Sequence, residues 1–181
     1  MAKLTITEAL AETKTIAKRI AAKKEAVMRY FARLTGAPDP LEKDGGSVEH
    51  VRRERQAIKD LEERLVAIRC AIQMSNLTEI MVIDGMTRSV AAWLNWRREV
   101  SAGQLAFYNT MLNTVNTWRQ PTREGGKAMM RTPAGQVTEL PEPIFSVNEK
   151  DLAAEAEALT KLLGDLDGRL SLANATTTID L

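Results

Sequence analysis

Apolar side chains in the first 34 residues recur at alternating intervals of four and three. The series comprises Ile6, Leu10, Thr13, Ala17, Ile20, Lys24, Val27, Phe31 and Leu34, of which Thr13 and Lys24 are polar. Such spacing places side chains along one face of an α-helix and is typical of a helix that packs lengthwise against another. Thr5 precedes Glu8 by three residues, the spacing of a capping box, so we predict that the helix begins at Thr5.

A second apolar series follows a segment that opposes helical geometry. That segment contains two prolines and three glycines, namely Gly36, Pro38, Pro40, Gly45 and Gly46. Ser47 is then placed to cap a helix whose stripe comprises Val51, Glu54, Ile58, Leu61, Leu65, Ile68 and Ile72. Both helices have an expected length of about 42 to 44 Å, and the break between them is short. The pattern therefore predicts an antiparallel helical hairpin.

The second half of the chain repeats this pattern less regularly. A third helix is expected over residues 88–119, with a stripe of Val90, Leu94, Tyr108, Met111, Val115 and Trp118. Its middle, REVSAGQL, is poor in apolar residues and contains Gly103, which predicts a kink. Ser146 and Glu149 have the spacing of a second capping box. They precede the stripe of a fourth helix, which comprises Leu152, Ala156, Leu159, Leu163, Leu166 and Leu170.

Residues 78–83, TEIMVI, have the composition of a β-strand and are followed by Asp84 and Gly85, a pair that favours a tight turn. An isolated strand leaves its backbone donors and acceptors unpaired, so this one needs a partner. The chain offers two candidates, the segment GQVTELPEPIFSV and the C-terminal ATTTIDL.

The C-terminal segment invites two interpretations. SNLTEI after the second helix and ANATTTI after the fourth both combine an asparagine with a threonine-bearing extended run, which indicates either a diverged duplication or a chance similarity of turns. Thr177, Thr178 and Ile179 either add as a strand to a neighbouring subunit, or pair within their own chain or fray.

These patterns predict a mainly α fold of antiparallel helical hairpins, with four long helices and a few short β-strands. Residues 1–75 form an N-terminal helical hairpin, and residues 76–86 form a short strand and turn. Residues 87–172 form a second helical hairpin with a long loop at 120–146, and residues 173–181 form an extended tail.

Composition agrees with this fold and names no polyanionic partner. Aromatic residues make up 4% of the chain and charged residues 27%, a balance typical of helical bundles, and the formal net charge is +1. The first helix has seven basic and three acidic residues, whereas residues 147–172 have three basic and six acidic ones. Opposite charges suit packing of these helices against each other, within or between chains, and the alternative is two solvated faces.

The sequence contains few candidates for catalytic or metal-binding residues. Cys70 is the single cysteine, which excludes an intrachain disulfide, and we expect it to be a small buried side chain. His50 is the single histidine and is expected at the surface. No nucleotide-binding, zinc-protease, hydrolase or EF-hand motif occurs, so we expect no enzyme, cofactor or metal site. MAKLTITEAL lacks the apolar stretch of a signal peptide, which favours a soluble, non-secreted protein.

Tryptophan and basic residues supply the candidates for interaction. We expect Trp93 and Trp118 in the core, and Trp96, beside Arg97 and Arg98, at a protein interface. A glycine- and proline-punctuated loop carries a basic cluster, Arg119, Arg123, Lys127 and Arg131. Such a loop either contacts nucleic-acid phosphates or an acidic protein, or is simply solvated.

Three stretches resemble parts of small, mostly uncharacterised proteins of tailed phages and prophages. They are LTITEAL (4–10), DPLEKDGGS (39–47) and NLTEIMVIDGMTRSVAAWLNWRREV (76–100), and they lie chiefly in the first hundred residues. The resemblance implies a place among virion or assembly proteins and transfers no active-site residue.

We therefore expect a non-enzymatic structural protein of a phage particle, a head, neck or tail component that acts in multiple copies. Its expected partners are itself and other virion proteins, without a membrane or cofactor, and it is expected in the virion after synthesis in the host cytoplasm. The alternative is a nucleic-acid-binding accessory protein that uses the basic first helix and the loop 119–131, with Lys18, Arg19 and Lys23 as its test positions.

Overall fold

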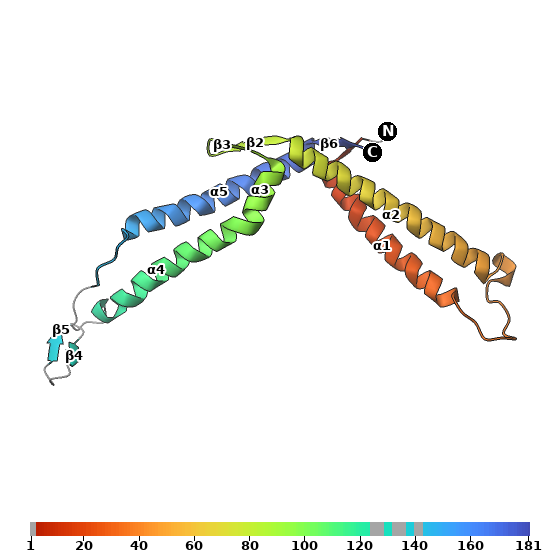
Figure 1. Cartoon of the computed structure of the whole chain (residues 1–181), viewed down its shortest axis with the longest axis horizontal. Helices are drawn as coiled ribbons and strands as arrows, with labels where there is room; N and C mark the ends of the chain where they lie inside the picture. The colour runs from red at the N-terminus through yellow and green to blue at the C-terminus, as the bar shows by residue number, and fades with distance from the viewer. Residues whose placement is uncertain (1–2, 124–128, 132–136, 140–142) are drawn as a thin grey trace. The chain divides into compact units, whose positions relative to one another are not determined.

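The computed structural model describes residues 3–123, 129–131, 137–139 and 143–181. The fold is mainly α, with long helices and short two-stranded sheets, as the apolar spacing predicted (Figure 1). Its contacts divide the chain into two compact units. The first unit comprises Met1–Ile80, Ser89–Ala91 and Arg169–Leu181, and the second comprises Met81–Arg88 and Ala92–Gly168.

The first unit is a helical hairpin with a small sheet at the end where the chain termini meet (Figure 1). Its elements are β1 (Lys3–Thr5), α1 (Ile6–Tyr30), a 3-10 turn (Glu42–Asp44), α2 (Ser47–Thr78) and β6 (Thr178–Asp180). β1 pairs antiparallel with β6, so that Leu4 lies opposite Ile179. The core of the unit comprises Ile6, Ala9, Ile16, Ile20, Ile68 and Ile179. Of the interpretations left open for the C-terminal tail, the structure shows pairing within the chain.

The apolar stripe of α1 differs from the predicted one at every second position. The predicted capping box is confirmed, because the Thr5 hydroxyl accepts from the Glu8 N–H and the Glu8 carboxylate accepts from the Thr5 N–H. Ala9 and Ile16 are buried, whereas the predicted neighbours Leu10 and Ala17 are exposed. Phe31 and Leu34 are exposed beyond the end of the helix as well. Both series are compatible with helical periodicity, and the small Ala9 together with the larger Ile16 packs against α2.

The start of α2 is not capped by the Ser47 side chain as predicted. Ser47 is itself the first helical residue, after Gly46, and its hydroxyl is directed to the Asp39 carboxylate. The predicted inner stripe of α2 is confirmed, since its members are buried or half-buried.

The second unit contains the remaining helices and strands. Its parts are β2 (Ile80–Ile83), β3 (Met86–Ser89), α3 (Val90–Trp96), a π-helical turn (Arg97–Ser101), α4 (Ala102–Arg123), β4 (Met129–Arg131), β5 (Val137–Glu139) and α5 (Glu149–Thr176). Of these elements, the contact division assigns residues 80, 89–91 and 169–176 to the first unit. β2 pairs with β3, and neither predicted partner is used. Asp84 and Gly85 have φ values of 49° and 74°, which allow a tight two-residue turn and make the adjacent segment the partner.

The long helix that begins at Val90 is interrupted where a kink was predicted. Its π-helical turn ends at Ser101, whose buried hydroxyl donates to the carbonyl of Arg97 at 2.7 Å. Trp93 is fully buried, as predicted, and its indole N–H donates to the carbonyl of Met81 at 3.1 Å. Trp118 is 61% exposed, so its predicted place in the core is wrong. It lies in the last turns of α4, beyond the buried Val115.

The stripe of α5 is confirmed, because all its predicted members are buried or half-buried. The predicted capping box is wrong. α5 begins at Glu149, and the Asn148 side chain accepts from the N–H of Lys150 at 3.0 Å, so Asn148 supplies the cap in place of Ser146.

The junctions between helix and strand occur twice with the same hydrogen bonds. Ile6, the first residue of α1, donates its N–H to the carbonyl of Thr177 at 3.0 Å. Val90, the first residue of α3, donates to the carbonyl of Glu79 at the same distance. Thr78 and Thr176 end α2 and α5, and each hydroxyl donates to the carbonyl four residues earlier.

The same positions are buried near both junctions. At corresponding positions Ile68 and Leu166 are both fully inaccessible, and Met81 and Ile179 are both buried in the following strand. The chain thus contains the order strand, helix, helix, strand twice. Of the two interpretations of the repeated sequence, this recurrence supports the duplication.

Candidate interaction surface on helix α2

Helix α2 has two stripes of regularly spaced side chains on different faces. The inner stripe packs against α1 and includes the buried Ile68. A second series, which we call the outer stripe, is spaced by three, four or seven residues and comprises Val48, Arg52, Arg55, Lys59, Val66, Cys70, Met74 and Leu77. All of its members are exposed. A helix with two such faces is suited to packing against two partners, and α1 occupies one of them.

Ion pairs along the inner stripe hold α1 and α2 together. Lys23 lies 2.9 Å from Glu54, and Arg64 lies 3.0 Å from Glu12. These four side chains are roughly one-fifth to two-fifths exposed, so each pair contributes at most about 1 kcal/mol and mainly fixes the register. The basic residues of α1 are therefore partly compensated by α2, whereas the sequence also allowed pairing with the acidic fourth helix.

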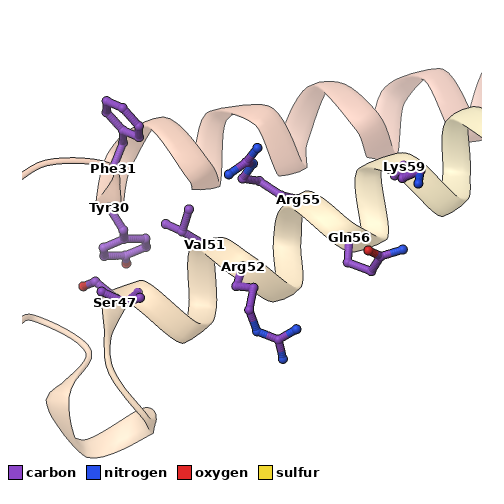
Figure 2. A pocket seen from close by; sticks show the side chains of 9 residues that line it. Tyr30, Phe31, Ser47, Val51, Arg52, Arg55, Gln56 and Lys59 are labelled. Atoms are coloured by element: carbon purple, nitrogen blue, oxygen red, sulfur yellow. The ribbon is translucent and has the colours of Figure 1, made fainter.

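The basic half of the outer stripe borders a groove of about 650 Å³ at the end of the hairpin where the loop joins α1 to α2. Its lining comprises Tyr30, Phe31, Ser47, Val48, Val51, Arg52, Arg55, Gln56 and Lys59. Figure 2 shows Tyr30 facing Ser47 between the helices, Arg55 reaching toward α1, and Arg52 pointing away from it. The groove therefore combines exposed apolar groups with cationic ones.

The cations of the groove differ in how far they are neutralised. Arg52 makes two hydrogen bonds to the carboxylate of Glu49, at 2.7 and 2.8 Å, and this contact raises the pKa of the guanidinium. Lys59 lies 4.0 Å from Glu63. Arg55 makes no ion pair within the part of the chain that the structure describes, so it is the cation most available to a partner.

Asp39 fixes the loop that leads into α2. Its carboxylate accepts from the N–H groups of Leu41 and Ser47, at 3.0 and 2.9 Å, and from the Ser47 hydroxyl. The hydrogen bonds to Ser47 and Leu41 lower the pKa of Asp39 to about 2. Asp39 thus satisfies the first N–H group of α2 and holds that end of the groove in place.

His50 lies closer to the core than predicted. It is half-buried, and its ring meets the ring of Tyr30 edge to face with centroids 5.2 Å apart. The prediction of an exposed surface histidine is therefore wrong. His50 is one residue before the inner-stripe member Val51, so it turns partly toward α1.

The other half of the outer stripe is apolar. Val66, Met74 and Leu77 are 60%, 61% and 59% exposed, and Cys70 lies between them. The expectation of a buried Cys70 is wrong, because the residue lies midway between Ile68 and Ile72 in sequence and so points to the opposite side of the helix. Apolar side chains that gather on one exposed face mark a contact surface more often than scattered ones do.

The second hairpin lacks this surface at the corresponding positions. Counted from the matching Thr78 and Thr176, the places of Val66, Cys70, Met74 and Leu77 are taken in α5 by Gly164, Gly168, Leu172 and Ala175. A Cβ atom added at either glycine would meet no other atom within 4 Å. Small residues replace Val66, Cys70 and Leu77, and Leu172 keeps a large apolar side chain in place of Met74, so the continuous outer stripe is particular to the first hairpin.

None of the residues expected at an interface belongs to the outer stripe. Trp96 is half-buried and packs edge to face on Trp93, with ring centroids 5.7 Å apart. Arg97 pairs with Asp167 at 3.0 Å, and Arg98 pairs with the adjacent Glu99.

The remaining candidates lie in strands, at a helix end or outside the described residues. Thr177 is half-buried, Thr178 is exposed and Ile179 is buried. Arg123 ends α4 and Arg131 ends β4, and the side chains of both, with Lys127, lie outside what the structure describes. The outer stripe was missed in the sequence because Arg52, Arg55 and Lys59 interrupt its apolar pattern.

No protein-family model, curated protein or solved structure matches the chain. Within the described ranges, no helix is long and apolar enough to span a membrane. The same residues contain no group of three or more side chains placed to hold a metal ion.

Proposed function

We propose that this chain is a non-enzymatic structural protein that works in multiple copies through protein–protein contacts. The observation that carries the proposal is the outer stripe of α2, a second packing face on a helix of 32 residues. Burial of the exposed parts of Val66, Met74 and Leu77 would contribute about 1 to 2 kcal/mol for each side chain. A partner helix is the simplest structure that covers such a face along its length.

The assembly that we propose is a phage particle, with this chain in its head, neck or tail. This part of the proposal rests on the resemblance of three stretches in the first hundred residues to proteins of tailed phages and prophages. The partners are then further copies of the chain and other virion proteins. The location is the virion, after synthesis in the host cytoplasm.

Two measurements test the proposal. Mass spectrometry of purified particles should find the chain at a fixed copy number relative to the other virion proteins. Sedimentation velocity of the purified protein should show self-association that grows with concentration, or a complex with another virion protein. A strict monomer at high concentration, absent from particles and without affinity for their components, contradicts the proposal.

A second candidate is a nucleic-acid-binding accessory protein, and the basic groove is the observation that favours it. Arg55 and Lys59 border the groove beside the exposed ring of Phe31, and cations beside an aromatic ring suit a nucleic-acid strand. Of the positions first considered on α1, Lys23 is already paired with Glu54, which leaves Lys18 and Arg19 as the better test sites.

Retention on DNA at low salt separates the two candidates. The nucleic-acid candidate predicts binding that falls steeply with salt and weakens in the variants Arg55→Ala and Lys18→Ala. Lys161→Ala, on the outward side of α5, serves as the control. No retention at low salt removes this candidate and leaves the structural one.

A further inference from the structure

We infer that the outer stripe of α2 binds the outer stripe of α2 from a second copy of the chain, antiparallel, with Val66 of each copy at the two-fold axis. This inference rests on the proposed function in multiple copies and names the contact. A two-fold contact uses the same patch on both subunits, so the patch must be complementary to itself. The charges that flank the stripe meet this condition.

The charges around Val66 select the antiparallel direction. Glu62 lies four residues before Val66 and Arg69 lies three residues after it, both exposed. Glu62 also lies 3.3 Å from Lys24 of α1, but this pair is at the surface and Glu62 stays 50% exposed, so its carboxylate can still meet a partner's arginine. In an antiparallel pair centred on Val66, Glu62 of each copy comes beside Arg69 of the other, which gives two equivalent ion pairs. A parallel pair would instead bring Glu62 level with Glu62 and Arg69 level with Arg69, so neither ion pair could form.

The same register accounts for both halves of the outer stripe. Met74 of one copy lies within one residue of the level of Lys59 of the other, and Leu77 lies level with Arg55. The aliphatic parts of lysine and arginine cover apolar side chains while their charged ends stay in water. The basic half of each stripe therefore covers the apolar half of the partner, and the two basic halves remain at opposite ends.

The size of this contact predicts its strength. The register overlaps residues 55–77, about 34 Å of helix, on a strip about 10 Å wide. Such a strip is smaller than the ~800 Å² per partner of a typical stable interface, so we expect a dimer that forms only at micromolar or higher concentration. Many copies in one assembly would strengthen it by raising the effective concentration.

A charge exchange within one chain tests the pairing. Glu62→Arg alone and Arg69→Glu alone should each weaken dimerisation at least about tenfold in sedimentation equilibrium, because each places like charges together twice. The double variant Glu62→Arg, Arg69→Glu should restore it to within about threefold of the wild type. Thr160→Arg, at the corresponding position of α5, is the matched control and should change nothing.

Cross-linking tests the register, since Cys70 is the single cysteine and can be moved. In the background Cys70→Ser, the variant Val66→Cys should give a covalent dimer with a short bis-maleimide, by addition of one thiol from each copy. Leu77→Cys should not, because the two sites would lie about 33 Å apart along the antiparallel helices. Gly164→Cys, which corresponds to Val66 in α5, is the second negative control.

Three results would overturn the inference. They are a double variant that stays as weak as the single ones, cross-linking of Leu77→Cys, and equal cross-linking of Gly164→Cys and Val66→Cys. If the wild type still self-associates in those cases, the multi-copy function stands and only this contact is wrong. If the wild type neither self-associates nor occurs in particles, the function and the contact fail together.

Discussion

The two helical hairpins are alike where they hold their strands and different on their outward faces. Ile68 and Leu166 occupy the same place and are both fully buried, and the helix-to-strand junctions share their hydrogen bonds. On the opposite face, Val66 of α2 corresponds to Gly164 of α5. Buried positions near the helix-to-strand junctions are therefore shared by the two hairpins, whereas the large apolar side chains of the outward face occur mainly in the first hairpin.

The largest expected effect on stability is at a core position where the two hairpins have different residues. Trp93 is fully buried where the first hairpin has Ala9, so the second unit depends on one large side chain. Trp93→Ala should lower the free energy of unfolding by about 3 to 5 kcal/mol, because it leaves a cavity and removes the hydrogen bond to Met81. Urea denaturation followed by circular dichroism measures this. Trp118→Ala, in α4 and exposed, should change the free energy of unfolding by less than about 1 kcal/mol.

Matched substitutions test whether the two inner stripes are equivalent. Ile68→Ala and Leu166→Ala remove the same kind of side chain from fully buried sites, so each should cost about 2 to 5 kcal/mol. We expect the two losses to agree within about 1 kcal/mol in urea denaturation, provided that the transition has one step. A loss at only one of the two positions would show that the hairpins are stabilised in different ways.

The caps of the two hairpins should respond differently to pH. Hydrogen bonds lower the pKa of Asp39 to about 2, from an ordinary value of 3.8. A carboxyl with a lowered pKa in the folded state stabilises the protein above its unfolded pKa, and this contribution is lost as pH falls through the folded pKa. Asp39→Asn should therefore lower the free energy of unfolding at neutral pH, and the difference from wild type should shrink between about pH 4 and 2.

The corresponding cap of α5 supplies the control for this pH dependence. Asn148 does not titrate, so Asn148→Ala should cost about 1 kcal/mol. That loss should be the same at pH 7 and at low pH in thermal denaturation at several pH values. A loss for Asp39→Asn that stays constant down to about pH 2 would show that the ionised carboxylate contributes nothing to the loop.

The inner stripes of α2 and α5 could be predicted because isoleucine and leucine recur there without competing positions. In α1 two adjacent apolar residues, Ala9 and Leu10, fit the same period, and only the packing against α2 selects Ala9. The partner of β2 was missed because the segment MTRS has little apolar character, and its pairing follows from the turn at Asp84 and Gly85.

The candidate site was harder to predict than the fold. Periodicity shows which face of a helix is apolar. It does not show whether a second face, whose stripe mixes cations with apolar residues, is exposed to solvent. Arg55 and Val66 belong to one stripe only when the exposed side of α2 is known. Trp96 was predicted at an interface because of its residue type, yet its ring packs on Trp93 within the second unit.

Two exposed positions that correspond in the two hairpins compare the outward faces directly, and substitutions there should have the smallest effect on stability. Met74 and Leu172 correspond in the two hairpins and are 61% and 65% exposed. Met74→Lys and Leu172→Lys should each change the free energy of unfolding by less than about 0.5 kcal/mol, because neither side chain is packed in the fold. Met74→Lys alone should abolish self-association, since it places a charge beside Lys59 of the partner on the outer stripe. Equal loss of self-association in both variants would mean that both hairpins carry contact surfaces, and that small residues on α5 do not distinguish them.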